Sequence, residues 1–143
     1  MEETGAARTP EVSLEETFLA AVAGLPAEEH RGRVVAEALG YLQRGFDAHY
    51  AGDRTADDDI LVGDNAYALS VETIARLDEP RFVAVASRMI RDGAGRIAAG
   101  DRVTLETWTP HLAGLLDIIS GEGAQRSEER IRRAVGELDG RRE

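Results

Sequence analysis

Residues 60–90, ILVGDNAYALSVETIARLDEPRFVAVASRMI, decide the fold class of this chain. Apolar side chains recur at the three-to-four-residue period of an amphipathic helix on both sides of a break at Asp78, Glu79 and Pro80. Asp78 is expected to cap the second helix, with Pro80 in its first turn, where the missing amide does no harm. The stretch therefore predicts two antiparallel helices joined by a short connection.

The residues before this hairpin carry further helix signals. Ser13 and Glu16 have the spacing of a capping box, in which each side chain satisfies an exposed amide of the other residue. Apolar residues then repeat at helical spacing until Pro26, which marks a break. The same period predicts one helix over residues 27–50 and another over residues 57–77.

The residues after the hairpin are harder to divide. A broad apolar face extends the helix that begins at Pro80 to about residue 100, and Gly93 and Gly95 within it favour a close helix crossing or a bend. Residues 103–108 fit an extended segment or a helix, and a helix is expected over residues 110–119.

The last expected helix is short and charged. Ser127 is expected to cap it after a glycine-containing turn, and Ile131, Val135 and Leu138 share one side. Neither strand alternation nor an internal repeat is present in the sequence.

The length of 143 residues fits one domain. We expect residues 1–12 to form a flexible N-terminal arm, residues 13–139 a helical domain and residues 140–143 a C-terminal tail. The predicted fold is an all-α single-domain bundle of about five to six helices.

Composition excludes several classes of function. The chain contains no cysteine, which rules out disulfide scaffolds, thiolate metal sites and thiol nucleophiles. A net charge of −10 opposes binding to nucleic acid, so no nucleic-acid partner is expected. No apolar run has the length of a transmembrane segment, and a cytoplasmic location is expected.

Four aspartates near the start of the helix expected over residues 57–77 are the candidates for a metal site. Hard cations such as magnesium prefer carboxylate oxygens, so a magnesium-dependent enzyme is one hypothesis. Acids in a first turn also complement the helix dipole, which is the simpler interpretation. The spacing does not match a calcium loop. The four residues are Asp57, Asp58, Asp59 and Asp64.

The other polar residues form no catalytic pattern, and no catalytic residue is predicted. His30, His49 and His111 lie on different expected helices and lack the i, i+4 spacing of a helical metal site. The serines show no nucleophile elbow. Trp108, the only tryptophan, fits either the core or an interface, and the core is favoured.

Residues 34–100 resemble part of the all-helical polyprenyl (trans-isoprenyl) diphosphate synthase family. The similarity is strongest over residues 60–90, where an apolar pair and Gly-Asp open a helix and a short acidic turn leads into the next. GRIAAGD, residues 95–101, is similar to the end of that second helix in the family. The resemblance implies a truncated isoprenoid-synthase-like bundle.

The chain departs from the family at its catalytic motifs. Full enzymes carry two Asp-rich motifs on facing helices, which hold the magnesium ions that bind a diphosphate. Residues 43–52, QRGFDAHYAG, have the single Asp47 in place of the first Asp-Asp-x-x-Asp motif, and no second motif follows. The resemblance therefore implies that this chain has no cofactor and is not catalytic alone, with magnesium only in a catalytic partner.

The chain most resembles the short non-catalytic subunit of heteromeric long-chain synthases, which supports activity and influences product length. The implied partner is a larger catalytic subunit, with a homodimer as the other assembly, and the implied pathway is that of menaquinone or a related isoprenoid quinone. A generic helical interaction or regulatory protein with no isoprenoid role is the alternative. Interface candidates, each of which also fits the core, are Tyr67, Val71, Ile74, Phe82, Val85 and Met89.

Overall fold

The computed structural model describes residues 13–50, 57–101 and 103–142, leaving out the side chains of residues 49–50, 57–60 and 141–142. These described residues form six α-helices and one short 3-10 helix, without a strand, which confirms the all-α prediction. The helices are α1 (Leu14–Val22), α2 (Glu29–Tyr50), α3 (Asp57–Ala75), α4 (Pro80–Ala98), α5 (Leu105–Ser120) and α6 (Ala124–Arg142), with the 3-10 helix η2 (Pro26–Glu28) before α2.

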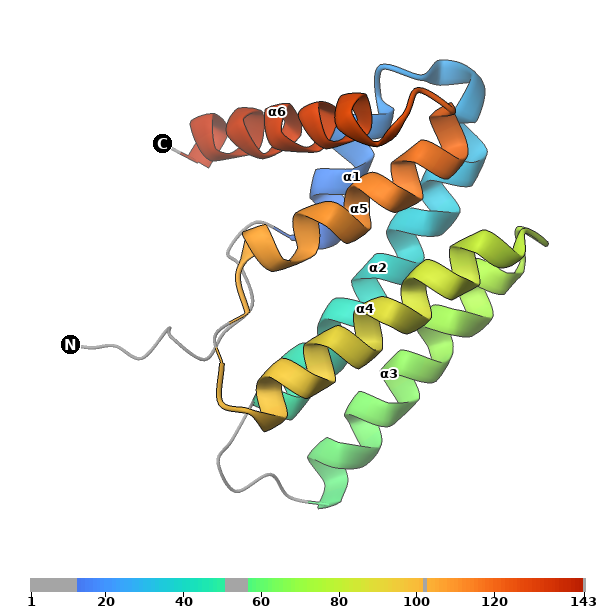
Figure 1. The fold of residues 1–143 in the computed structure, drawn as a ribbon. Coiled ribbons are helices and arrows are strands. Elements are labelled where there is room, and N and C mark those ends of the chain that lie inside the picture. Colours follow the sequence, from blue (N-terminus) through green and yellow to red (C-terminus); the bar gives the residue numbers. More distant parts are fainter. Residues whose placement is uncertain (1–12, 51–56, 102, 143) are drawn as a thin grey trace.

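The helices are arranged in two groups that share the long helix α2 and the helix α5 (Figure 1). On one side, α3 packs against α2 and α4 and lies at the edge of the bundle. On the other, α1 packs against α2 and α6, and α5 joins α4 to α6. None of the described helices has the length and apolar content that crossing a bilayer requires.

One continuous hydrophobic core receives side chains from all six helices, as expected of a single folding unit. Its centre is aromatic, since the rings of Phe46 on α2 and Trp108 on α5 stack with centroids 4.8 Å apart. Trp108 is fully buried, which confirms the prediction that it belongs to the core. The largest fully buried side chains are Trp108, Phe18, Phe46, Phe82, Leu14, Leu39, Leu42, Ile74, Met89, Leu112, Leu115 and Leu116.

Gly93 is the point where α4 crosses this aromatic centre. A Cβ atom at Gly93 would lie 2.6 Å from Cζ of Phe46 and 2.8 Å from the Trp108 ring, closer than van der Waals contact allows. The close crossing expected of the glycines in α4 is therefore present at Gly93. A Cβ at Gly95 would meet nothing within 4 Å, so that glycine has no such role.

The caps of α1 and α4 differ in how closely they follow the sequence pattern. Ser13 caps α1 as predicted, its hydroxyl accepting a hydrogen bond from the Glu16 amide at 2.8 Å. The cap of α4 is Glu79 rather than the predicted Asp78, with the Glu79 carboxylate accepting from the Arg81 amide. Asp78 instead adopts a φ of 55°, a left-handed conformation that aspartate tolerates better than most residues.

The helix α5 begins earlier than predicted, at Leu105, and Pro110 lies inside it instead of opening it. Residues 105–108 are helical, which resolves the two alternatives left by the sequence. The amide of Thr104 donates to the Thr107 hydroxyl at 3.3 Å at this start. Burial of Trp108 favours the extra turn, because burying a large apolar side chain contributes about 1.5–3 kcal/mol.

The helix α6 also begins earlier than predicted. It starts at Ala124, and Ser127, the predicted cap, is a buried residue within the first turn whose amide donates to the Gly123 carbonyl. Gly123 has a φ of 101°, which allows the chain to turn sharply just before the helix. At the other end α6 continues to Arg142, so residues 140–142 are helical instead of forming a tail, since one glycine weakens a helix without ending it.

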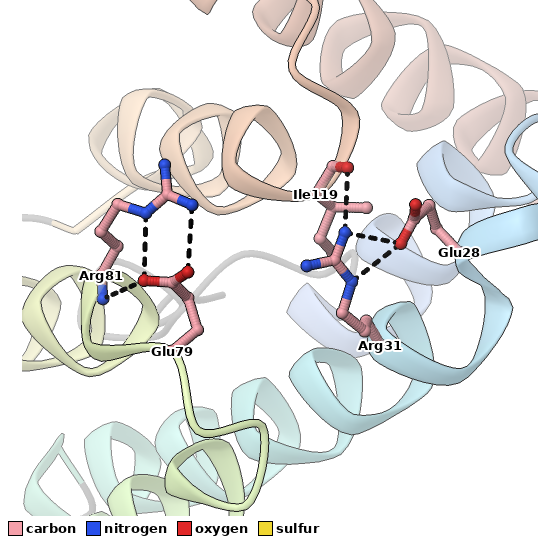
Figure 2. A network of polar contacts seen from close by, with 5 residues as sticks. All are labelled: Glu28, Arg31, Glu79, Arg81 and Ile119. Carbon is pink, nitrogen blue, oxygen red and sulfur yellow. Dashed lines mark hydrogen bonds and ion pairs between the residues drawn. The ribbon is translucent and has the colours of Figure 1, made fainter.

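Two arginines near the starts of α2 and α4 form the polar contacts of Figure 2. The guanidinium of Arg31 donates from Nε to the Glu28 carboxylate at 2.8 Å and from Nη2 to the Ile119 carbonyl at 3.3 Å. Arg31 thus ties the start of α2 to the last turn of α5, where carbonyls lack helical partners. Arg81 makes two side-chain hydrogen bonds of 3.1 Å to Glu79, which lower the pKa of that carboxyl.

Candidate functional site

An open, shallow hollow of about 560 Å³, lined mainly by charged residues, lies where α4 faces the first half of α5. Most of its lining comes from α4, with one residue from the loop that follows α4 and one from α5. The lining residues are Arg88, Arg91, Asp92, Gly95, Arg96, Asp101 and His111.

The helical period of α4 brings its charged lining residues together. Arg88, Asp92 and Arg96 follow one another at i, i+4 spacing and therefore form a row along the helix, with Arg91 in the next row. Gly95 lies beside Arg91 in that second row and has open space above it, because a Cβ there would have no neighbour within 4 Å. The α4 side of the hollow thus carries three arginines and one glycine without neighbours above it.

Asp92 holds two of the positively charged or chargeable groups in place. Its Oδ1 accepts from Nε of Arg96 at 2.9 Å, and its Oδ2 lies 3.1 Å from Nε2 of His111. Partial burial by itself raises the pKa of Asp92, but the hydrogen bonds from His111 and Arg96 outweigh this effect, and the pKa lies below its ordinary value. Asp92 is therefore ionised at neutral pH and fixes both neighbours.

The helix α4 is positively charged in an acidic chain. It carries four arginines and one aspartate, a net charge of +3, whereas the whole chain has a net charge of −10. Arg88 and Arg91 are exposed and form no ion pair with any residue of the described part of the chain. Their guanidinium groups are consequently available to an anion from outside.

The chemistry that this arrangement supports is binding. Guanidinium groups recognise phosphate and carboxylate oxygens through pairs of parallel hydrogen bonds. Asp92 and His111 have the geometry of an acid that orients a base, but no serine, threonine or cysteine is among the described residues that line the hollow. The pair therefore has no hydroxyl or thiol beside it to activate.

The predicted metal candidates are only partly described. Asp57, Asp58 and Asp59 belong to the first turn of α3, but their side chains lie outside the described residues. Asp64 lies about two turns beyond Asp57 on the same helix, and it is exposed. Where side chains are described, no three histidines or acids come together as metal ligands. The metal site accordingly stays a prediction.

The six predicted interface residues separate into two groups. Ile74, Phe82, Val85 and Met89 are buried in the core of this chain, so they do not contribute to its surface. Tyr67 and Val71 are half-buried, and the ring of Tyr67 packs edge-on against Phe46 with centroids 5.3 Å apart.

The exposed apolar residues of α3 lie elsewhere than the sequence pattern predicted. Leu61 and Val62 expose 65% and 58% of their surface, the largest values among the described large hydrophobic side chains. Neither residue is among the six interface candidates that the sequence predicted. Helical periodicity does not separate them from core residues, since the adjacent Leu115 and Leu116 are both buried in α5.

Sequence reasoning also missed the arginine hollow, because arginine is the only basic residue besides histidine and occurs throughout the chain. The spacing of Arg88, Asp92 and Arg96 was the available signal. Of the histidines, His111 lines the hollow, His30 is exposed, and the side chain of His49 lies outside the described residues.

Comparisons of this chain with protein-family models, with curated proteins and with solved structures found no match.

Proposed function

We propose that this chain is a non-catalytic helical subunit that associates with a larger, catalytic polyprenyl diphosphate synthase subunit and supports its activity and product length. The observation that carries the proposal is the pair of exposed apolar residues, Leu61 and Val62, on the edge helix α3. That helix belongs to the segment, residues 60–90, in which the resemblance to the synthase family is strongest.

The packing of α3 leaves one side available for a partner. The helix buries Ala66, Ser70 and Ile74 within the bundle, while Asn65 and Glu72 are exposed. Covering a leucine or valine that is otherwise exposed contributes about 1.5–3 kcal/mol. Leu61 and Val62 together therefore supply the kind of apolar contact around which a protein interface forms.

The sequence argues against prenyl transfer by this chain alone. Asp47 is the single carboxylate at the position where the family has an Asp-Asp-x-x-Asp motif. Magnesium bound to a diphosphate needs several oxygen ligands, and one carboxylate leaves that set incomplete. We expect the purified chain to leave farnesyl diphosphate unextended, and elongation by the purified chain would overturn the non-catalytic assignment.

Association is tested by capturing the tagged chain from an extract of its own cells and identifying the co-purifying protein by mass. A stoichiometric synthase subunit with both Asp-rich motifs is the expected result. In a Leu61→Glu, Val62→Glu double variant, this partner should be lost, because two carboxylates would be buried without partners.

The matched control is Leu19→Glu, which places a charge at the other exposed large hydrophobic residue, 41% exposed on α1. This variant should retain the partner. Equal loss from both variants would contradict the assignment of the interface to α3. If the parent chain captures a protein that is not a prenyl synthase, and the α3 variant loses it, the result would favour a generic helical interaction protein.

A further inference from the structure

We infer that the hollow between α4 and α5 is a binding site for a phosphoryl anion, in which the guanidinium groups of Arg88, Arg91 and Arg96 are the ligands. This inference does not depend on the proposed association with a synthase, because it concerns the isolated chain. It is carried by the placement of three arginines around one hollow of an acidic protein.

Positive charge without a partner among the described residues lies on α4 beside the hollow. Arg88 and Arg91 are three residues apart on α4, a spacing at which like charges repel one another. Neither is neutralised by an ion pair with a described residue, and the nearby carboxylate of Asp92 is already shared by Arg96 and His111. A bound anion would relieve this repulsion, which favours occupancy by a ligand of high negative charge.

The guanidinium group of Arg96 is already held in place before a ligand binds. Asp92 bonds Arg96 through Nε, so the terminal nitrogens of that guanidinium face no other acceptor in the described part of the chain. A guanidinium that is already held loses less conformational entropy when it binds. His111 brings an imidazole from α5 to the same hollow.

The residues that line the hollow also indicate the class of ligand. The described lining consists of charged side chains, one glycine and one histidine, without a leucine, isoleucine, valine or phenylalanine, so the hollow favours a charged ligand. Asp92 and Asp101 also line it, and the carboxylate of Asp92 is already engaged by Arg96 and His111. A compact group with several charged oxygens, such as a phosphate or diphosphate, best matches three guanidinium forks.

The test is isothermal titration calorimetry of the full chain with inorganic diphosphate at low salt. Saturable binding at one site is expected, and an Arg88→Ala, Arg91→Ala double variant should bind about tenfold or more weakly, because it removes two charge-assisted ligands. The control is an Arg76→Ala, Arg126→Ala double variant. It removes two exposed arginines, Arg76 just after α3 and Arg126 on α6, and changes the net charge by the same amount.

Each outcome decides the proposal. Retained affinity in the control and weakened affinity in the α4 variant support the site. Equal weakening of both variants would reduce the binding to overall charge, and the absence of saturable binding at millimolar diphosphate would also overturn the proposal. Citrate serves as the second probe, and citrate binding as tight as that of diphosphate would contradict the phosphoryl class. Circular dichroism confirms that each variant is folded.

Discussion

Aromatic rings of α2 and α5 pack against α4, whereas arginines of α6 form ion pairs with α5 and with the loop before α6. At Gly93 the rings of Phe46 and Trp108 come so close to α4 that no side chain fits there. Along α6, by contrast, Arg132 donates to Glu106 of α5 at 2.8 Å and Arg130 to Glu122 at 2.7 Å.

The difference teaches where each part of the bundle obtains its stability. Aromatic packing depends on shape and on exclusion of water, so it is insensitive to salt and to pH. Exposed ion pairs contribute little at moderate ionic strength and depend on both. The aromatic contact at Gly93 should therefore dominate the unfolding free energy, and the α6 contact should respond to solution conditions.

The largest effect is expected for Trp108→Ala. The side chain is fully buried and stacked on Phe46, so its removal leaves a cavity and should lower the unfolding free energy by about 3–5 kcal/mol. Chemical denaturation followed by far-ultraviolet circular dichroism measures the change, since the variant lacks the only tryptophan. A loss below about 1 kcal/mol would contradict the central role assigned to this ring.

Alanine substitution at two glycines of α4 should change the unfolding free energy in opposite directions, and each change should be smaller than that of Trp108→Ala. Gly93→Ala should destabilise the chain by about 1–3 kcal/mol, because the new methyl group overlaps the rings of Phe46 and Trp108. Gly95→Ala is the matched control and should stabilise it by about 0.5–1 kcal/mol, since its methyl group meets only open space and alanine favours the helix. Equal denaturation midpoints for the two variants would refute the close crossing at Gly93.

The α6 contact should weaken in acid. Hydrogen bonds from Arg130 to Glu122 and from Arg132 to Glu106 lower the pKa of both carboxyl groups. Their contribution to stability is present above the unfolded pKa of about 4.3 and is lost as the pH falls through the lower folded values. Glu122→Gln should flatten the decrease in unfolding free energy between about pH 6 and 3. Glu129→Gln, an exposed position on α6, should leave the slope unchanged.

The smallest effect is expected for Arg132→Ala. This exposed side chain joins Glu106 and Glu128, so its loss should lower the denaturation midpoint slightly at low salt. At about 1 M salt the midpoints of the variant and the parent should coincide, because the Debye length is then about 3 Å. A salt-independent difference would mean that Arg132 acts by packing its alkyl chain.

The elements that the sequence predicted correctly are those decided by neighbouring residues. The cap at Ser13 and the helix opened by Pro80 depend on hydrogen bonds and dihedral angles within a few positions. The starts of α5 and α6 were predicted too late, because burial of Trp108 favours an extra turn of α5 and the sharp turn at Gly123 lets α6 begin at Ala124. Local signals could not include that burial energy.

The candidate site was less predictable than the helices. The row formed by Arg88, Asp92 and Arg96 follows from helical spacing and could have been read from the sequence. His111 joins it only because α5 packs beside α4, which brings a residue 19 positions away within hydrogen-bond distance of Asp92. Four of the six interface candidates lie in the core for a related reason, since periodicity identifies an apolar face without identifying its neighbour.

By itself, the sequence determined that this protein is built from helices, that it is acidic and that it lacks cysteine. Those properties follow from local periodicity and from composition. Only the tertiary structure decided that Ile74 lies in the core while Leu61 is exposed on the same helix, and that Gly93 rather than Gly95 permits the close crossing. The physical reason is that burial depends on which other helix packs against a residue, and helical periodicity carries no record of that partner.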